Sequence, residues 1–162
     1  MGFQSIVHGR IVIESNLDKV REIIQNLGND EWMFRTEMFG TGISDQTYYE
    51  NPVISFGATY KQIEYYWVEF IQEFENILRQ IDFDTAKIQL ETEILGTYNF
   101  FWKSKKQDKT SYEKEARMIE TEKWFFGFGN RDRWGLLETD LLEEEIFAID
   151  GFKYPIIDAR SQ

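Results

Sequence analysis

The chain has 162 residues, a net charge of −11 at pH 7 and no cysteine, and 42% of its residues are hydrophobic. This balance excludes a disordered chain, and the absence of cysteine excludes disulfides and thiolate metal sites. The length predicts a single domain over 1–162, with a core in 1–102 and a β-rich extension in 103–162.

The first predicted elements are a strand over 3–13 and a helix directly after it. The strand segment is rich in β-branched residues. The helix is indicated by apolar residues at helical spacing, which are Leu17, Val20, Ile23, Ile24 and Leu27. Ser15 or Asn16 could cap this helix through a side-chain oxygen, and Gly28 could end it in a left-handed conformation.

Four further elements are predicted before residue 95: strands over 32–39 and 53–62, a helix over 64–81, and a strand over 86–94. The helix has an apolar stripe made of Trp67, Phe70, Ile71, Phe74, Ile77, Leu78 and Ile81. The last strand alternates, with Ala86, Ile88, Leu90, Thr92 and Ile94 on one face and Lys87, Gln89, Glu91 and Glu93 on the other.

The order strand, helix, strand, strand, helix, strand predicts an α+β fold. It matches the ferredoxin-like βαββαβ arrangement, in which two helices cover one face of an antiparallel sheet. After a polar loop over 104–111, the extension is predicted to add a strand over 116–126 and a turn over 127–130. It is predicted to end in a hairpin over 146–156, because Asp150-Gly151 suits a two-residue type I′ turn.

The charge is distributed unevenly along the chain. Residues 1–102 contain 16 acidic and 7 basic side chains, whereas residues 103–114 contain 2 acidic and 5 basic ones. The overall potential would repel nucleic acid and anionic membranes and attract a basic protein, although acidity also serves solubility alone. No signal peptide and no apolar stretch near about 18 residues is evident. We therefore expect a soluble cytoplasmic protein that binds neither nucleic acid nor membranes.

Few residues are suited to catalysis or to metal binding. His8 is the only histidine, and nothing near it in sequence supplies a partner or a pocket. Gly127-Phe128-Gly129 lacks the third glycine of a dinucleotide-binding motif and the Gly-Lys-Ser/Thr ending of a P-loop. No catalytic residue, cofactor or metal site is therefore assigned.

Pairs of carboxylates leave an enzymatic alternative open. Glu91 and Glu93 are predicted on one strand face, and Glu120 and Glu122 on another. Two carboxylates roughly 5–9 Å apart could hydrolyse a glycosidic bond, with aromatic rings stacking on the sugar. Alternating glutamates are also the ordinary pattern of a solvent-facing strand.

An aromatic and basic segment over 124–134 is better suited to recognition. Strand alternation can bury only half of its rings on one face, and Trp and Arg are frequent hot-spot residues at protein interfaces. A second layer of structure could instead cover these rings. The candidate binding residues are Trp124, Phe126, Phe128, Arg131, Arg133 and Trp134, together with Glu91 and Glu93.

The sequence thus favours an acidic protein-binding module. Compact acidic domains of this size include inhibitors and immunity proteins that neutralise a basic partner such as a toxin, and electrostatic steering would speed that association. The alternatives are a small-molecule or carbohydrate-active enzyme that uses the strand carboxylates, and a homo-oligomeric structural protein. A homodimer is also compatible with the binding hypothesis.

Overall fold

The computed structural model describes residues 3–40, 51–105, 119–129, 132–133, 136–137 and 154, with the backbone alone at 128–129, 132–133 and 136–137. These residues form a seven-stranded antiparallel sheet, a two-stranded sheet and two α-helices. The elements are β1 (Gln4–Ile13), α1 (Leu17–Gln25), the 3-10 turn η1 (Thr36–Met38), β2 (Phe39–Gly40), β3 (Val53–Lys61), the 3-10 turn η2 (Ile63–Tyr66), α2 (Trp67–Leu78), β4 (Phe83–Glu91), β5 (Thr97–Ser104), β6 (Ile119–Glu120), β7 (Trp124–Gly129), β8 (Asp132–Arg133) and β9 (Leu136–Leu137). The α+β class predicted from the sequence is confirmed.

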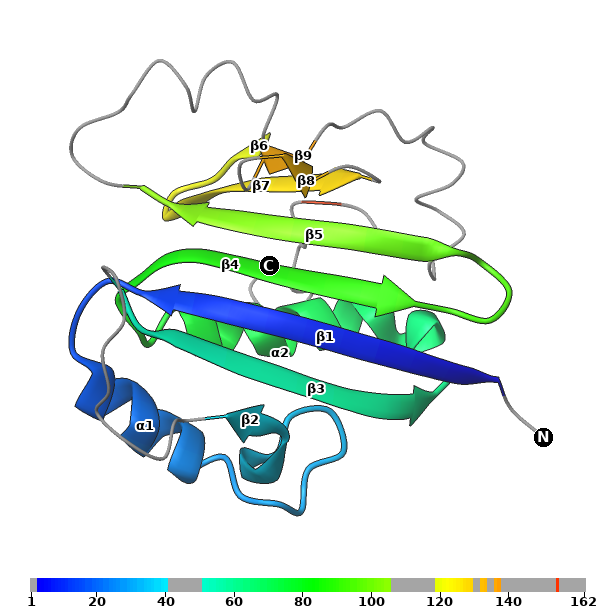
Figure 1. Ribbon diagram of the computed structural model, residues 1–162, viewed down its shortest axis with the longest axis horizontal. Helices are drawn as coiled ribbons and strands as arrows, with labels where there is room; N and C mark the ends of the chain where they lie inside the picture. Colours follow the sequence, from blue (N-terminus) through cyan, green and yellow to red (C-terminus); the bar gives the residue numbers. More distant parts are fainter. Residues whose placement is uncertain are drawn as a thin grey trace, which may run out of the picture.

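The large sheet has the strand order β2-β3-β1-β4-β5-β7-β6, so β1 lies between β3 and β4 (Figure 1). Side chains of a strand alternate between the two faces of a sheet, and those on the inner face of this sheet are buried. This inner face includes Val7, Ile11 and Ile13 of β1, Ile54, Phe56 and Tyr60 of β3, Ala86, Ile88 and Leu90 of β4, and Tyr98, Phe100 and Trp102 of β5. The alternation predicted for residues 86–90 is therefore confirmed.

Both helices pack into the same hydrophobic core as the inner face of the sheet. The core contains Val20 and Ile24 of α1 and, from α2, Trp67, Phe70, Ile71, Phe74, Ile77 and Leu78. Figure 1 shows α2 lying behind β1 and β4. The apolar stripes predicted for the two helices are thus the faces that they bury, although the predicted helix over 64–81 divides into η2 and α2.

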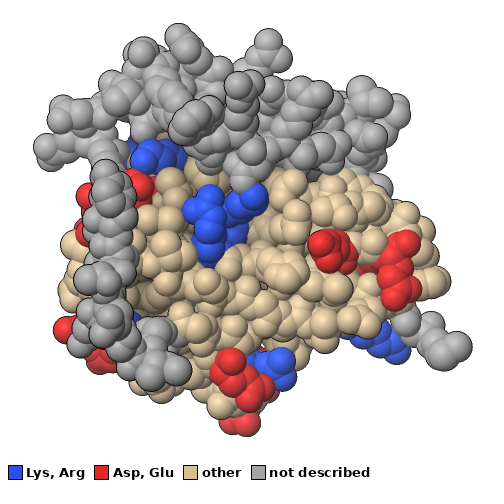
Figure 2. Space-filling model, in the orientation of Figure 1, with Lys and Arg blue, Asp and Glu red and all other residues tan. Residues whose placement is uncertain are grey.

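Figure 2 shows the opposite, outer face of the sheet. Uncharged residues cover most of its described part, and the charged side chains form small separate groups. The acidity of the chain is therefore not concentrated on this face.

One close approach in the sheet requires a glycine. Gly9 of β1 lies opposite Phe56 of β3, and the Phe56 ring covers the Gly9 backbone. A Cβ atom at Gly9 would lie 1.9 Å from Cζ of that ring. The missing side chain at residue 9 thus creates the space that an aromatic ring of the core occupies.

The strand predicted over 32–39 is wrong. Only Phe39–Gly40 pairs with β3, and residues 31–38 form a loop that ends in η1. The reason is that this segment is apolar without being alternating: Met33 and Phe34 are both buried, and the Phe34 ring centre lies 4.5 Å from that of Phe70. The contact of Phe34 with α2 and the hydrogen bond from the Tyr60 hydroxyl to the Met33 carbonyl hold this segment as a loop instead of a strand.

The strand predicted over 86–94 ends earlier, because residues 92–96 form a turn into β5. The Thr92 hydroxyl donates to the Gly96 carbonyl at 2.7 Å and accepts from the Leu95 amide at 2.9 Å. Gly96 has a φ of +97°, which a glycine adopts without steric cost. Ile94, which was predicted on the inner face, is 59% exposed.

In the extension, the strand predicted over 116–126 is divided in its described part. β6 and β7 are separated by a turn in which Thr121 Oγ1 donates to the Trp124 carbonyl at 2.8 Å. Residues 127–129 continue β7 beside β5, so the turn predicted to begin at residue 127 is wrong there. β9 pairs with β8 and contacts β5 and β7. Of the hairpin predicted over 146–156, only Tyr154 belongs to the described residues.

The predicted side-chain cap of α1 is wrong as well. Asn16 occupies the N-cap position in a left-handed conformation and makes no capping hydrogen bond, while the Ser15 hydroxyl bonds to the Asp82 carboxylate instead. Gly28 does adopt a positive φ of 77°, three residues after α1 ends. No helix among the described residues has the length and apolar character to span a membrane.

Candidate functional site

Two of the residues predicted for recognition, Trp124 and Phe126, lie in the hydrophobic core with 3% and 0% exposure. β7 is flanked by β5 and β6, and the inner side of Phe126 is covered by Tyr154, whose ring centre lies 3.7 Å away. The structure thus covers these two rings, which agrees with the alternative of a second layer of structure, and their role in binding stays a prediction. The covering layer comes from a residue 28 positions further along the chain.

The other members of that predicted segment lie at or beyond the limit of what is described. Phe128 belongs to β7 and Arg133 to β8, and only their backbone is described. Arg131 and Trp134 lie outside the described residues. Their role in binding stays a prediction.

The carboxylates of the enzymatic alternative do not converge. Glu91 pairs with Thr97 at one end of β5, whereas Glu120 is linked through Phe125 to Lys103 near the other end. Six residues of extended strand separate these positions by about 20 Å. Glu93 accepts a bond from the Gln4 amide at 3.2 Å, and Glu120 pairs with Lys105 at 2.8 Å.

Instead, the structure forms a groove between α2 and the loop that follows α1. Its volume is about 350 Å³. The lining residues are Leu27, Glu31, Trp32, Met33, Phe34, Glu69, Glu73, Asn76, Ile77 and Gln80. We call this feature the acidic groove, because three of its lining residues are glutamates and none is a lysine or arginine.

The floor of the acidic groove is apolar and its rim is charged. Phe34 and Ile77 are each 4% exposed. Glu31, Glu69 and Glu73 are exposed, and no ion pair or hydrogen bond of their side chains occurs among the described residues. Glu69 and Glu73 are neighbours one turn apart on α2, so their like charges repel. A cation in the groove would relieve this repulsion.

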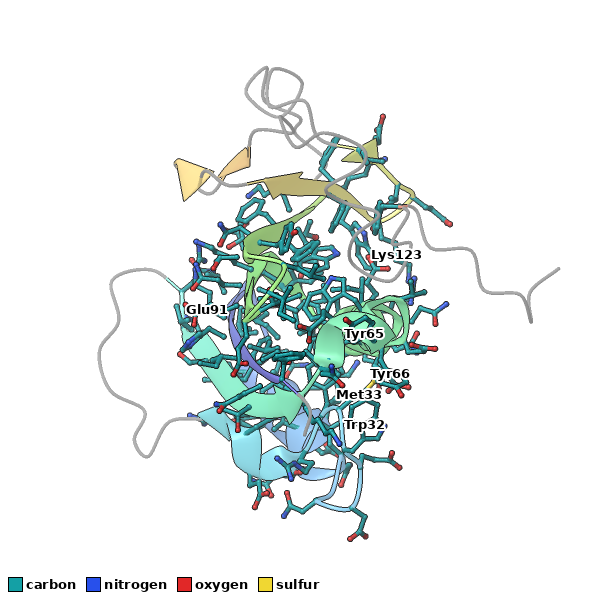
Figure 3. The ribbon with its side chains drawn as sticks, turned by 90° about the vertical axis from the view of Figure 1, so that its right-hand side faces the viewer. Trp32, Met33, Tyr65, Tyr66, Glu91 and Lys123 are labelled. Atoms are coloured by element: carbon teal, nitrogen blue, oxygen red, sulfur yellow. The ribbon has the colours of Figure 1, made fainter. Side chains whose placement is uncertain are left out.

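Exposed aromatic rings stand at one end of the acidic groove. Trp32, Tyr65 and Tyr66 are each 49% exposed. The Trp32 and Tyr66 rings meet edge to face, with centres 5.5 Å apart at 87°. Figure 3 shows Trp32, Met33, Tyr65 and Tyr66 close together, with Glu91 on the opposite side of the molecule. Such half-exposed rings are typical of energetic centres in protein interfaces.

Hydrogen bonds hold the loop wall of the groove in place. The Tyr60 hydroxyl donates to the Met33 carbonyl, and the Thr36 amide donates to the Gly28 carbonyl at 2.9 Å. The Glu37 amide donates to Asn29 Oδ1 at 3.0 Å. Burial raises the pKa of Tyr60 to about 12, against a smaller opposing effect of Arg35, so the phenol keeps its proton at neutral pH. These bonds tie the loop to β3 and link residues 28 and 29 to residues 36 and 37.

Sequence reasoning missed this groove, although part of its signal is present in the chain. Glu69, Glu73, Asn76 and Gln80 recur at helical spacing and form the polar face opposite the predicted apolar stripe. These residues line the same groove as Trp32 only because the loop that follows α1 folds back over α2. No local pattern contains that information.

A second, smaller cavity of about 150 Å³ lies beside Glu75, between α2 and the β6–β7 turn. Glu75 is 3% exposed, and its Oε2 accepts bonds from Trp102 Nε1 at 2.9 Å and from the Tyr154 hydroxyl at 2.6 Å. The Tyr154 oxygen in turn accepts from Trp124 Nε1 at 2.7 Å. Through these hydrogen bonds the carboxylate of α2 is linked to β5, to Tyr154 and, through Tyr154, to β7. The network therefore holds parts of the core together.

Electrostatics at Glu75 agree with a structural role. Burial raises the pKa of Glu75, while the bonds from Tyr154 and Trp102 and the charge of Arg79 act in the opposite direction. The guanidinium of Arg79, which also lines this cavity, lies 5.3 Å from the centre of the Trp124 ring. Within the part of the chain that is described, no group of three or more His, Asp or Glu side chains is arranged to hold a metal ion.

The acidic groove can therefore bind a cationic, partly apolar group, whereas the Glu75 cluster ties elements of the core together. Comparisons with known proteins add no further constraint: the chain matches no protein-family model, no curated protein and no solved structure.

Proposed function

We propose that the chain is an acidic cytoplasmic protein-binding module that captures a basic protein through the acidic groove. The observation that carries this proposal is the groove itself: an apolar floor, three carboxylates without a cationic neighbour in the lining, and exposed rings at one end. The sequence suggested the class of partner, and the groove supplies a surface of matching chemistry.

Two physical effects support capture of a basic partner. A net charge of −11 raises the rate of encounter with a cationic protein, and salt screens this effect. After encounter, Trp32 and Tyr66 supply rigid aromatic area, which contributes more to interface energy than most polar contacts. Long-range charge thus favours the encounter, and the groove favours retention.

Binding of a partner without catalysis of a reaction is compatible with an inhibitor or immunity-type role, in which the chain neutralises a basic partner such as a toxin. Among the described residues, Glu91 and Glu120, two of the carboxylates considered for catalysis, lie near opposite ends of β5. A surface that holds a partner without transforming it inhibits that partner if it covers a functional region.

We also infer that the core is a ferredoxin-like unit extended at one edge. The order β2-β3-β1-β4, with α1 between β1 and β2 and α2 between β3 and β4, supports this inference. β5, β7 and β6 then continue the sheet beyond β4.

The test begins with the purified chain immobilised at low salt and incubated with proteins of its native host. Each retained protein is identified, produced separately and examined by surface plasmon resonance between 20 and 500 mM salt. We expect a basic partner whose association rate constant falls at least tenfold over this range, while the dissociation rate constant changes less. Retention of acidic proteins alone, or an association rate that ignores salt, would contradict the proposal.

Light scattering of the free chain and of the complex supplies the control for self-association. A monomer that forms a complex of defined stoichiometry agrees with capture of a partner. A stable homo-oligomer in which the groove is buried would favour the structural alternative.

A further inference from the structure

We propose that the acidic groove is a socket for a single arginine side chain presented by the surface of the partner protein. The inference rests on the proposed function, because it names the group on the basic partner that the groove receives. Three properties of the groove lead to arginine: its apolar floor, the placement of its carboxylates, and the indole at its end.

The apolar floor matches the stem of a long basic side chain. Leu27, Phe34 and Ile77 line the interior, and Phe34 and Ile77 are almost fully buried. Lysine and arginine bury their methylene groups along apolar surface while the charged head stays near polar groups. The volume of about 350 Å³ is near the lower end for small-ligand pockets, about 300–1,000 Å³. It is sufficient for one such side chain and the backbone that carries it.

The carboxylates approach the groove from two elements. Glu69 and Glu73 come from successive turns of α2, and Glu31 comes from the facing loop. A planar guanidinium offers five N–H donors and can bind a carboxylate through two parallel bonds, whereas an ammonium group acts as a point charge. Carboxylates from two elements therefore favour arginine over lysine.

The indole of Trp32 adds a second reason for arginine. Tyr66 and Tyr60 contact the ring edge to face, with centres 5.5 and 6.4 Å away, and the residue is still 49% exposed. A guanidinium stacks on an aromatic face through cation–π attraction, and Trp gives the strongest such contact. Trp32 would thus cover one side of the bound head group.

Arg35 and Arg79, which adjoin lining residues in the sequence, are not themselves part of the groove lining. Arg35 lies 3.6 Å from the Glu37 carboxylate. Arg79 donates to Asn76 Oδ1 at 2.9 Å and lies over Trp124. The cation that the groove favours is therefore expected to come from a partner.

The test uses three acetylated peptides that differ only in a central run of four residues: arginine, lysine or the neutral isostere citrulline. Binding to the full chain is measured by titration calorimetry at low salt, and the Trp32 indole N–H is followed by NMR after assignment with Trp32→Phe. We expect the arginine peptide to bind about tenfold more tightly than the citrulline peptide, and more tightly than the lysine peptide. We also expect it to shift the Trp32 signal.

Two double variants with equal loss of charge distinguish the socket from general attraction. Glu69→Gln with Glu73→Gln removes two carboxylates from the groove, whereas Glu22→Gln with Glu122→Gln removes two exposed carboxylates elsewhere. We expect the first pair, and separately Trp32→Ala, to weaken binding of the arginine peptide about tenfold. The second pair should weaken it less than about twofold, since distant exposed charges are screened. The NMR spectrum of each variant verifies that it is folded.

Equal weakening by both pairs, equal affinity for arginine and citrulline, or equal affinity for arginine and lysine would overturn the socket. Its failure can be distinguished from failure of the proposed function. If a basic partner binds with strong salt dependence and is insensitive to the groove variants, the socket is wrong and capture stands. If the arginine peptide binds in the groove but no basic protein does, capture is wrong, and only the preference of the groove for a guanidinium group stands.

Discussion

At the scale of single residues, Glu75 is a carboxyl group whose surroundings favour its neutral form. The group is buried, and its pKa is raised above its ordinary value of 4.5 by burial. The bonds from Tyr154 and Trp102 and the nearby Arg79 reduce this shift. The net upward shift means that ionisation of Glu75 is less favourable in the folded chain than in the unfolded chain.

This upward shift fixes the sign of a pH effect on stability. A carboxyl with a raised folded pKa contributes most stability below its unfolded pKa, and the contribution is lost as pH rises through the folded value. Glu75→Gln stays neutral and can still accept from Trp102 and Tyr154. We therefore expect the free energy of unfolding of the variant to rise relative to that of the wild type as the pH increases above about 4.5. Urea unfolding at a series of pH values measures this difference, and a constant difference would contradict the account.

Trp124 and Trp32 illustrate which residue roles a sequence reveals. Both lie in aromatic segments, and the sequence pattern predicted a binding role for Trp124, whose segment also contains two arginines. The structure buries Trp124 between α2 and Tyr154 and leaves Trp32 half-exposed beside three carboxylates. The difference depends on contacts between residues 28 or more positions apart, such as Trp32 with Tyr60 and Trp124 with Tyr154, which periodicity does not encode.

At the scale of elements, sequence periodicity predicted the helices and strands that bury one face. The stripes of α1 and α2 and the alternation of residues 86–90 are faces that pack on a single core, so these elements were predictable. The loop over 31–38 was not, because its apolar residues are placed by Phe70 and Tyr60 rather than by a repeating pattern. β5 was not predicted from the sequence, because its five buried residues are consecutive and show no alternation.

The contact between Gly9 and Phe56 gives a prediction for β1. Gly9→Ala would place a methyl group inside the Phe56 ring, which is itself packed against Phe34, Phe39 and Phe74. The ring cannot move without disturbing these neighbours, so we expect a loss of about 1–3 kcal/mol in the free energy of unfolding. Denaturant unfolding measures it.

Gly40→Ala is a matched control for this substitution. A Cβ at Gly40 would lie 3.7 Å from the Ser55 carbonyl, an ordinary contact, and the residue is exposed. We expect a change within about 0.5 kcal/mol. If the two variants were equally stable, the close approach of Phe56 would not be the reason for glycine at residue 9.

At the scale of the whole molecule, charge and shape make separate contributions to the proposed capture. Composition alone predicts attraction to a basic partner, because net charge acts over a distance and requires no particular fold. It cannot predict where the partner binds. In the structure the outer sheet face carries few charges, whereas the groove beside α2 combines carboxylates with exposed rings. We therefore propose the groove as the interface.

Hydrogen exchange of the chain, free and in complex with its purified basic partner, tests this placement most directly. We expect slower exchange of backbone amides in 27–34 and 66–80, with little change in β1, β3 and β4 away from the groove. Protection of the outer sheet face or of the β6–β7 region, with unchanged exchange in 27–34 and 66–80, would contradict it.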